Sequence, residues 1–327
     1  MLRTRLCDMF EVEYPILNAP MGGGDAPAEL AAAVSAAGGL GMIGGTSVGG
    51  VEWLVAQIRK TRDLTDRPFG VGFISHFPNT GELMSAALDE GVRVIAHSFA
   101  DPSPFVEAAH AGGARVLCQV RTVAEARAAA AAGVDVVVAQ GTEAGGHTGR
   151  VSTLPLVPRV VDAVAPVPVV AAGGIADGRG IAAALMLGAE GVWLGTRFLG
   201  THEAGVSDRY KARVVEATGD DTVLTDVFDI VTARPWPEGV SGRAIRNEFA
   251  ERWTGHEDEL RAWAIDHREE YQALGPEAEV REHSIWAGEA AGFVTGVSPA
   301  AQVVHELAAD ATAVLHSRPG AVLLPGE

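Results

Sequence analysis

One segment carries the clearest signal of how this chain folds: Val134-Asp135-Val136-Val137-Val138-Ala139-Gln140-Gly141-Thr142-Glu143-Ala144-Gly145-Gly146-His147-Thr148-Gly149. The apolar run from 134 to 139 is typical of a buried strand. The loop after it is rich in glycine, so its backbone can approach a flat or charged ligand closely. His147 lies near its far end and can move a proton near neutral pH. Two interpretations follow: a ligand-binding loop with a proton-transfer residue, or a glycine-rich turn with a solvated histidine.

The same alternation of strand and helix recurs through the first two thirds of the chain. Predicted strands span 16–18, 40–43, 69–75, 92–97, 115–120, 134–139, 169–172 and 191–194. Predicted helices span 27–37, 51–61, 81–90, 103–111, 122–132, 153–164, 179–187 and 203–218. Eight such units predict a parallel sheet covered by helices, and eight strands close a (β/α)8 TIM barrel. An open doubly wound sheet is the alternative, although it usually has fewer strands.

The pattern changes after residue 219, so we predict a barrel over 1–219 and a mainly helical lid or substrate subdomain over 220–290. Residues 291–327 then hold a helix over 300–315 that returns to the barrel, with Ser298 as its N-cap and Pro299 at its first position. Five aromatic residues punctuate the lid, and we expect most of them to form its own small core. They are Trp236, Phe249, Trp253, Trp263 and Tyr271.

Composition narrows the class of protein. The 327 residues are 47% hydrophobic, enough for a large core, and the net charge is −17. An acidic chain has no basic excess to neutralise phosphates, which argues against nucleic acid or an anionic membrane as the main partner. Cys7 and Cys118 lie far apart, in no metal-like spacing. There is no 18-residue apolar span and no apolar leader, so we expect a soluble, cytoplasmic protein without a bound metal.

Unusual loops follow the predicted strands at the end of the barrel where ligands bind. They contain Ala19-Pro20-Met21-Gly22-Gly23-Gly24, the glycine-rich segment Gln140 to Gly149, Gly173-Gly174-Ile175-Ala176-Asp177-Gly178 and Gly195-Thr196-Arg197. We expect Gly174 and Gly195 to offer backbone N–H groups to a phosphate, with Thr196 as a hydroxyl donor. Arg197 could pair with that phosphate or form a salt bridge on the outer wall. Asp177 fits a turn or cap better than a ligand, because it would repel phosphate.

Several other polar residues have open roles. Gly39-Leu40-Gly41-Met42-Ile43-Gly44 matches a dinucleotide fingerprint, but a helix precedes it and its glycines flank a strand, so we reject that interpretation. His76 and His97 end predicted strands and could face the same pocket as His147, although core or rim histidines are more common. Gln119 could contact a ligand at the barrel mouth or pack there.

These motifs resemble those of the nitronate monooxygenase family, also called 2-nitropropane dioxygenase-like. The resemblance rests on Gln140 to His147, on Ala171 to Gly178 and on Gly188 to Phe198. It extends to the opening segments, Ala19 to Gly22 and Ala36 to Gly41, and to the later ones, Gly242 to Asn247 and Trp286 to Gly288. Together they cover nearly the whole chain.

The resemblance implies a TIM barrel that binds FMN without a covalent bond. It implies flavin contacts from the backbone of Ala19, Pro20 and Met21 and from Gln119, Gln140, Gly145 and Gly146, and phosphate contacts from Gly173, Gly174, Trp193, Leu194, Gly195 and Thr196. His147 would be the acid–base residue. Two departures concern Gly72, where many members have asparagine, and the small number of tyrosines: Tyr14, Tyr210 and Tyr271.

Three functions are compatible with these residues. The first is oxidation of alkyl nitronates by FMN and O₂ to a carbonyl compound and nitrite. The second is FMN-dependent reduction of a quinone or enoyl thioester by NAD(P)H. The third is a flavin-free lyase or isomerase of a sugar phosphate, which lacks an evident Schiff-base lysine because Lys60 and Lys211 fall on predicted helices. A homo-oligomer is compatible with all three.

Overall fold

The computed structural model describes residues 2–47 and 49–322. Eight parallel strands form one sheet, in the order β1-β9-β8-β6-β5-β4-β3-β2. Their bounds are β1 Ile16–Asn18, β2 Gly41–Gly44, β3 Phe69–Ile74, β4 Val94–Ser98, β5 Arg115–Val120, β6 Val136–Gln140, β8 Val169–Ala172 and β9 Gly191–Leu194. A parallel bridge between Leu17 and Leu40 joins the first and last strands, so the sheet closes into the predicted TIM barrel and the open-sheet alternative is wrong.

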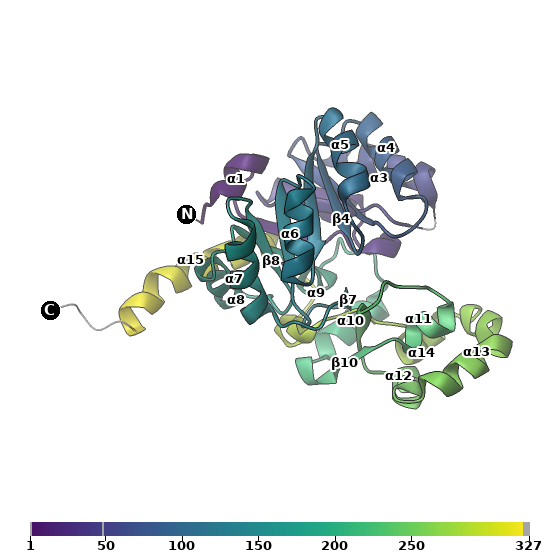
Figure 1. Cartoon of the computed structure of the whole chain (residues 1–327). Coiled ribbons are helices and arrows are strands. Elements are labelled where there is room, and N and C mark those ends of the chain that lie inside the picture. Colours follow the sequence, from purple (N-terminus) through teal and green to yellow (C-terminus); the bar gives the residue numbers. More distant parts are fainter. Residues whose placement is uncertain (1, 48, 323–327) are drawn as a thin grey trace.

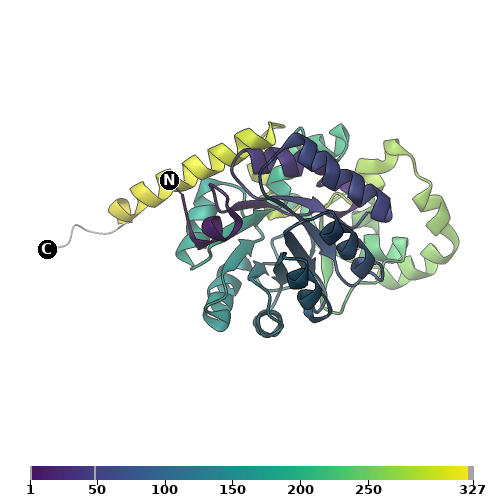
Figure 2. The ribbon, with the colours of Figure 1, turned by 90° about the horizontal axis from the view of Figure 1, so that it is seen from above.

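Helices surround the barrel (Figures 1 and 2). They are α1 Arg5–Phe10, α2 Ala28–Ala36, α3 Gly50–Leu64, α4 Thr80–Asp89, α5 Ser103–Ala111, α6 Val123–Ala131, α7 Thr153–Val164, α8 Gly178–Met186, α9 Thr196–Leu199 and α10 Asp208–Glu216. Short 3₁₀ helices span Gly22–Gly24, Gly219–Asp221, Pro276–Ala278 and Glu289–Phe293. Each barrel strand lies within two residues of its predicted range. The predicted helix 203–218 is shorter, because Ser207 accepts a hydrogen bond from the Tyr210 N–H and starts α10 there.

Two apolar layers hold the barrel together. One fills its interior, where Leu17, Met42 and Val138 pack with side chains of α1 that close the end opposite the lid. The other lies between strands and helices and contains Ile16 and Phe73. Successive strand residues alternate between the two layers, as the period of two in a strand requires.

The barrel closes through a side chain at its seam. Asn18 is fully buried, and its amide nitrogen donates to the Met42 carbonyl at 2.8 Å. The Met42 N–H donates to the Asn18 Oδ1, also at 2.8 Å. This carboxamide therefore satisfies the two backbone groups that a neighbouring strand would otherwise pair.

A second lobe lies beside the barrel (green in Figure 1). It contains α11 Val227–Thr232, α12 Glu248–Trp253, α13 Glu257–Gln272 and α14 Glu279–Glu282. It also holds a three-stranded antiparallel sheet, in the order β10-β11-β7, in which β10 is Thr222–Thr225 and β11 is Ser241–Ile245. The third strand, β7 Gly146–Thr148, belongs to the glycine-rich segment 140–149. The lid is therefore not purely helical, and part of the predicted glycine loop is one of its strands.

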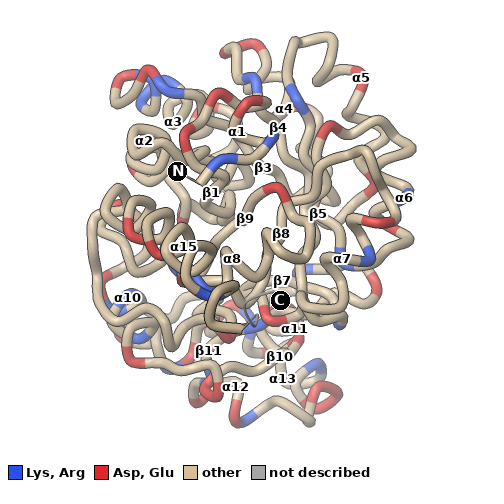
Figure 3. The backbone as a smooth tube through the Cα atoms, turned by 90° about the vertical axis from the view of Figure 1, so that its left-hand side faces the viewer, with Lys and Arg blue, Asp and Glu red and all other residues tan. Residues whose placement is uncertain are grey.

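The last helix, α15 Ala300–Val322, packs on α8 and α2 and extends past the barrel (Figure 2). It begins one residue after Pro299, and its first N–H, on Ala300, donates to the Glu203 carboxylate at 2.9 Å. The helix therefore starts one residue later than the predicted position of Pro299 implies, with Pro299 just before it, and Ser298 forms a bridge with Thr201. No helix among residues 2–47 and 49–322 combines the length and apolarity needed to cross a membrane. Acidic and basic positions are interspersed on the face seen in Figure 3.

Candidate active site

A cavity of about 530 Å³ lies at the carboxyl ends of the barrel strands, between them and the lid. The loops after β1, β6, β8 and β9 form its floor, and lid residues such as Trp236 and Trp286 line its other side. Of the residues predicted to contact the flavin, all except Leu194 line this cavity. They are Ala19, Pro20, Met21, Gln119, Gln140, Gly145, Gly146, Gly173, Gly174, Trp193, Gly195 and Thr196. Leu194 packs between strands and helices, and its carbonyl accepts the Ala19 N–H at 2.8 Å.

The glycines of the phosphate-type loop stand where a side chain is excluded by the backbone conformation and by the neighbouring loop. Gly173 and Gly174 have φ values of 98° and 71°, which L side chains rarely adopt. A Cβ at 173 would lie 2.7 Å from the Gly141 carbonyl oxygen. Thr196 accepts the Gly288 N–H at 2.9 Å, which leaves its own O–H free to donate. The donor set suits the phosphate end of a flavin nucleotide.

Arg197 follows Gly195 and Thr196 in the chain, but it does not line the cavity. Burial lowers the pKa of its guanidinium, and the charge of Glu306 of α15 opposes that shift. The phosphate interpretation of Arg197 is therefore wrong, and within the described residues no carboxylate lies close enough for the salt-bridge alternative. Asp177 caps α8 by accepting the Gly180 N–H at 3.0 Å, as expected.

The departure at position 72 has a steric cause. A Cβ on Gly72 would overlap the ring of Pro20, one of the residues that line the cavity. The small residue therefore lets the loop after β1 settle against β3. Nearby, the side chains of Gln119 and Gln140 form a hydrogen bond across β5 and β6, and both line the cavity.

The dinucleotide fingerprint has a different physical basis. Gly41 and Gly44 belong to β2, and side chains there would overlap the carbonyls of Ala31 and Met21. These glycines allow backbone segments to approach each other closely, and they lie within a strand, not in a turn that leads from a strand into a helix.

His147 lies on β7 and faces a carboxylate from the lid. Its Nε2 is 2.9 Å from Oδ2 of Asp229, and both side chains are about nine-tenths buried, at 10% and 11% exposure. The other carboxylate oxygen, Oδ1, accepts the Trp236 indole N–H at 2.9 Å. The imidazole is therefore held by one group, which leaves its second ring nitrogen for a ligand in the cavity it lines.

Aromatic rings enclose this imidazole. The Trp236 ring stacks on it, with centroids 3.4 Å apart and planes 13° apart. The Trp286 ring is 4.8 Å away and Phe99 is 6.4 Å away. Phe99 has φ of 66°, a conformation that non-glycine residues seldom adopt and that often occurs at functional sites.

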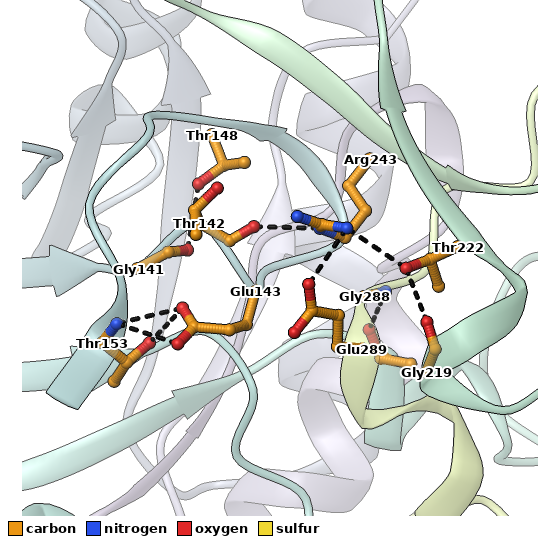
Figure 4. A network of polar contacts seen from close by, with 11 residues as sticks. Gly141, Thr142, Glu143, Thr148, Thr153, Gly219, Thr222, Arg243, Gly288 and Glu289 are labelled. Carbon is orange, nitrogen blue, oxygen red and sulfur yellow. Dashed lines mark hydrogen bonds and ion pairs between the residues drawn. The ribbon is translucent and has the colours of Figure 1, made fainter.

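A polar network fixes the motif loop in place (Figure 4). Glu143 accepts the N–H and the hydroxyl of Thr153 at the start of α7, at 3.0 and 2.9 Å. The Arg243 guanidinium on β11 donates to the Thr142 carbonyl at 2.9 Å and pairs with Glu289 at 3.1 Å. The network ties the segment that carries His147 both to the barrel and to the lid.

The other histidines near strand ends differ from His147. His97 is fully buried, accepts or donates a hydrogen bond with Ser75 at 2.8 Å and stacks on Phe105 of α5. Burial lowers its pKa to about 4, so it is a neutral core residue. His76 lies 4.7 Å from the Trp236 ring, and burial lowers its pKa as well.

Asp25 is an acidic group in the cavity lining that sequence analysis left unmentioned. Burial, and to a smaller extent the charge of Glu279, raise the pKa of its carboxyl to about 6. Tyr210 also lines the cavity, and its hydroxyl donates to the Trp286 carbonyl at 3.3 Å. Tyr14 and Tyr271 lie elsewhere: Tyr14 contacts His305, and Tyr271 belongs to the lid core.

Sequence analysis missed the hydrogen-bond partner of His147 and the ring that stacks on it. Asp229 interrupts the apolar run Val227-Phe228-Asp229-Ile230-Val231, and a buried acid in such a run is a signal of a partner. Trp236 is the exception to the prediction that most of the lid aromatics form the lid core. The prediction is correct for the other four aromatics, which cluster together: Phe249, Trp253, Trp263 and Tyr271.

Known proteins resemble this chain in sequence and in fold. The family model for nitronate monooxygenase matches residues 3–310. FabK from Thermotoga maritima has a TM-score of 0.88 at 34% identity, over 98% of this chain and all of that one. Nitroalkane oxidase from Streptomyces ansochromogenes has a TM-score of 0.81 at 30% identity, over 96% and 99%.

A third relative is named after a carboxyl-CoA substrate and not after a nitroalkane. The (3aS,4S,5R,7aS)-5-hydroxy-7a-methyl-1-oxo-octahydro-1H-indene-4-carboxyl-CoA dehydrogenase of Mycobacterium tuberculosis is 39% identical over 253 residues, 77% of this chain and 68% of the relative. The family match spans the barrel, the cavity and the lid together. The chain belongs to the nitronate monooxygenase family and is a flavin-dependent oxidoreductase.

Proposed function

We propose that this protein is an FMN-dependent enzyme that oxidises nitroalkanes and alkyl nitronates with O₂, giving a carbonyl compound and nitrite. The observation that carries the proposal is the His147–Asp229 pair in a cavity whose glycine loops suit a flavin nucleotide. The relative named nitroalkane oxidase supports the choice of substrate. FMN, when bound, would supply the electron-accepting group.

The residues divide the work between cofactor and substrate. The backbone of Ala19 to Met21, with Gln140 and Gly145, would contact the flavin ring and chain, whereas Gly174 and Thr196 would hold its phosphate. His147 would accept the α-proton of a neutral nitroalkane, and its imidazolium would then face the nitronate anion. Asp229 would stabilise that imidazolium across the 2.9 Å hydrogen bond.

A second function is favoured by a specific observation. Arg234 and His283 line the cavity beside the lid, and basic groups at that position suit a substrate or reductant that carries phosphates. The relative that acts on a carboxyl-CoA supports this alternative. It would be an FMN-dependent NAD(P)H oxidoreductase that reduces a quinone or an enoyl thioester, with His147 as the proton donor.

Anaerobic mixing separates the two functions. Ethyl nitronate or propionate 3-nitronate should bleach the flavin absorbance of the purified protein within one turnover, and nitrite should appear when O₂ is readmitted. NADH should bleach it only slowly. Rapid bleaching by NADH, with none by nitronates, would reject the nitronate proposal in favour of the second function.

The role of His147 has its own test. We expect His147→Ala to retain FMN and to lose nitroethane oxidation by at least about 100-fold, the contribution typical of a positioned base. Ethyl nitronate is already deprotonated, so its oxidation should fall much less. His110→Ala, at an exposed position on α5, is the matched control. Equal losses on both substrates would contradict the role of His147 as a base.

A further inference from the structure

We propose that Trp236 is a positioning residue for proton transfer at His147, because its indole N–H holds the side chain at position 229 in the orientation that presents an acceptor oxygen to the imidazole. The inference rests on the proposed function only for its choice of substrate. It assigns to Trp236 a role beyond packing in the lid.

The geometry divides the Asp229 carboxylate between two donors. Oδ1 accepts from Trp236 Nε1 at 2.9 Å, and Oδ2 faces His147 Nε2, also at 2.9 Å. A carboxylate only accepts hydrogen bonds, so a neutral imidazole must carry its proton on Nε2. Nδ1 is then the atom with a free lone pair, and it can take a proton from the substrate.

The orientation of Asp229 needs this second donor. The terminal torsion of an aspartate is broad and has no deep minimum of its own. Within the described residues, no Lys or Arg nitrogen forms an ion pair with this carboxylate, so the indole N–H is the group that opposes its rotation. Trp236 therefore holds the carboxylate in the orientation in which one of its two equivalent oxygens faces His147 Nε2.

Trp236 is itself held firmly enough for this role. Pro235 and Pro237 flank it and restrict the backbone on both sides. Its ring packs edge-on against His76 at 4.7 Å and Phe99 at 5.0 Å. The indole presents a fixed N–H to Asp229 and a fixed face to the imidazole.

The stacking also restricts how substrate reaches His147. Trp236 covers one face of the imidazole at 3.4 Å, and Trp286 lies 4.8 Å away. A substrate must approach the ring edge at Nδ1. There the α C–H bond of a nitroalkane would break, its electron pair would pass into the nitro group, and the proton would bond to Nδ1.

Asp229→Asn turns this geometry into a test. An asparagine offers one acceptor oxygen and one donor amide. The Trp236 N–H should hold the oxygen, so the amide would donate to His147 Nε2. The imidazole would then carry its proton on Nδ1 and could not act as a base. Replacing Trp236 by phenylalanine as well removes that constraint, and the amide can turn its oxygen towards Nε2.

The readout is the tautomer of His147, measured by ¹⁵N NMR on flavin-loaded protein labelled at its ten histidines. His147→Gln assigns the signal. We expect the Nε2–H form in the natural protein, the Nδ1–H form in Asp229→Asn, and a return of the Nε2–H form in Asp229→Asn/Trp236→Phe. Trp263→Phe, in the lid core, replaces the second change as the control.

Activity provides the second readout. Nitroethane oxidation should fall by about 100- to 10,000-fold in Asp229→Asn, the range for loss of a general base, and should recover about tenfold with Trp236→Phe. The same tautomer in Asp229→Asn with and without Trp236 would overturn the proposal. If no variant and not even the natural protein oxidised nitroethane, the proposed function would fail, yet the NMR result would still decide the role of Trp236.

Discussion

Replacing Asn18 by leucine tests whether a side chain closes the barrel. Leucine is close to asparagine in shape but leaves the N–H and carbonyl of Met42 without their 2.8 Å partners in a fully buried site. Each orphaned group costs about 1–3 kcal/mol, so two cost about 2–6 kcal/mol. The added apolar surface offsets about 1–2 kcal/mol. The difference spans about 0–5 kcal/mol, and we expect a net loss near its middle, about 2.5 kcal/mol, in the free energy of unfolding.

The assay is urea denaturation followed by tryptophan fluorescence, with the midpoint and slope compared at equal protein concentration. Ile16→Val, on the same buried strand, is the matched control, because it removes one methyl group and no hydrogen bond; it should cost about 0.5–1.5 kcal/mol. If Asn18→Leu cost no more than that control, the carboxamide would add nothing to the backbone bridge between Leu17 and Leu40 that joins β1 to the start of β2.

Three further predictions concern the cavity and the loop that carries His147. Gly174→Leu should release FMN, because φ of 71° and Glu143, 3.1 Å from a Cβ there, exclude the side chain; flavin that stays bound after gel filtration would refute the phosphate role. Arg243→Met should loosen the motif loop and lower nitroethane oxidation roughly 10-fold while FMN stays bound; unchanged kcat/KM would show that the 2.9 Å bond to Thr142 is dispensable. Asp25 has a pKa raised to about 6 from 3.8, so the folded state binds its proton more tightly and stability falls as pH rises from about 4 to 6. Asp25→Asn should therefore raise the stability of the flavin-free protein at pH 8, by about 3 kcal/mol from the 1.36 kcal/mol that each pKa unit represents, and change it little at pH 4; thermal unfolding at the two pH values checks this.

The barrel could be predicted because each of its units repeats one local pattern. Apolar runs such as Val136–Gln140 alternate with alanine-rich helices, and glycine loops mark the strand ends where ligands bind. Leu194 was the exception among the predicted flavin contacts. Its position in β9 turns the side chain towards the helices, which an assignment by motif range ignores.

The lid was harder to predict, because its role depends on contacts between distant residues. Asp229 is 82 positions from His147, and no local pattern joins them. The strand β7 could not be predicted from the glycine-rich sequence around it. It has three residues, which pair with β11, and a strand that short has no periodic hydrophobic pattern. Trp236 looked like the other lid aromatics in sequence and differs from them only in where its ring points.

The shared sheet makes the acid–base residue a joint product of two parts of the chain. His147 is paired with Gly242 of β11. The loop that precedes His147 lines the cavity together with Gly173 and Gly174 of the barrel. Exchange of the lid between family members would therefore change the orientation of the imidazole and replace its carboxylate partner. The barrel loops proposed to bind FMN would stay the same. New substrates could in this way be acquired without rebuilding the flavin site, since the barrel keeps the cofactor and the lid brings both the pocket wall and the partner of the base.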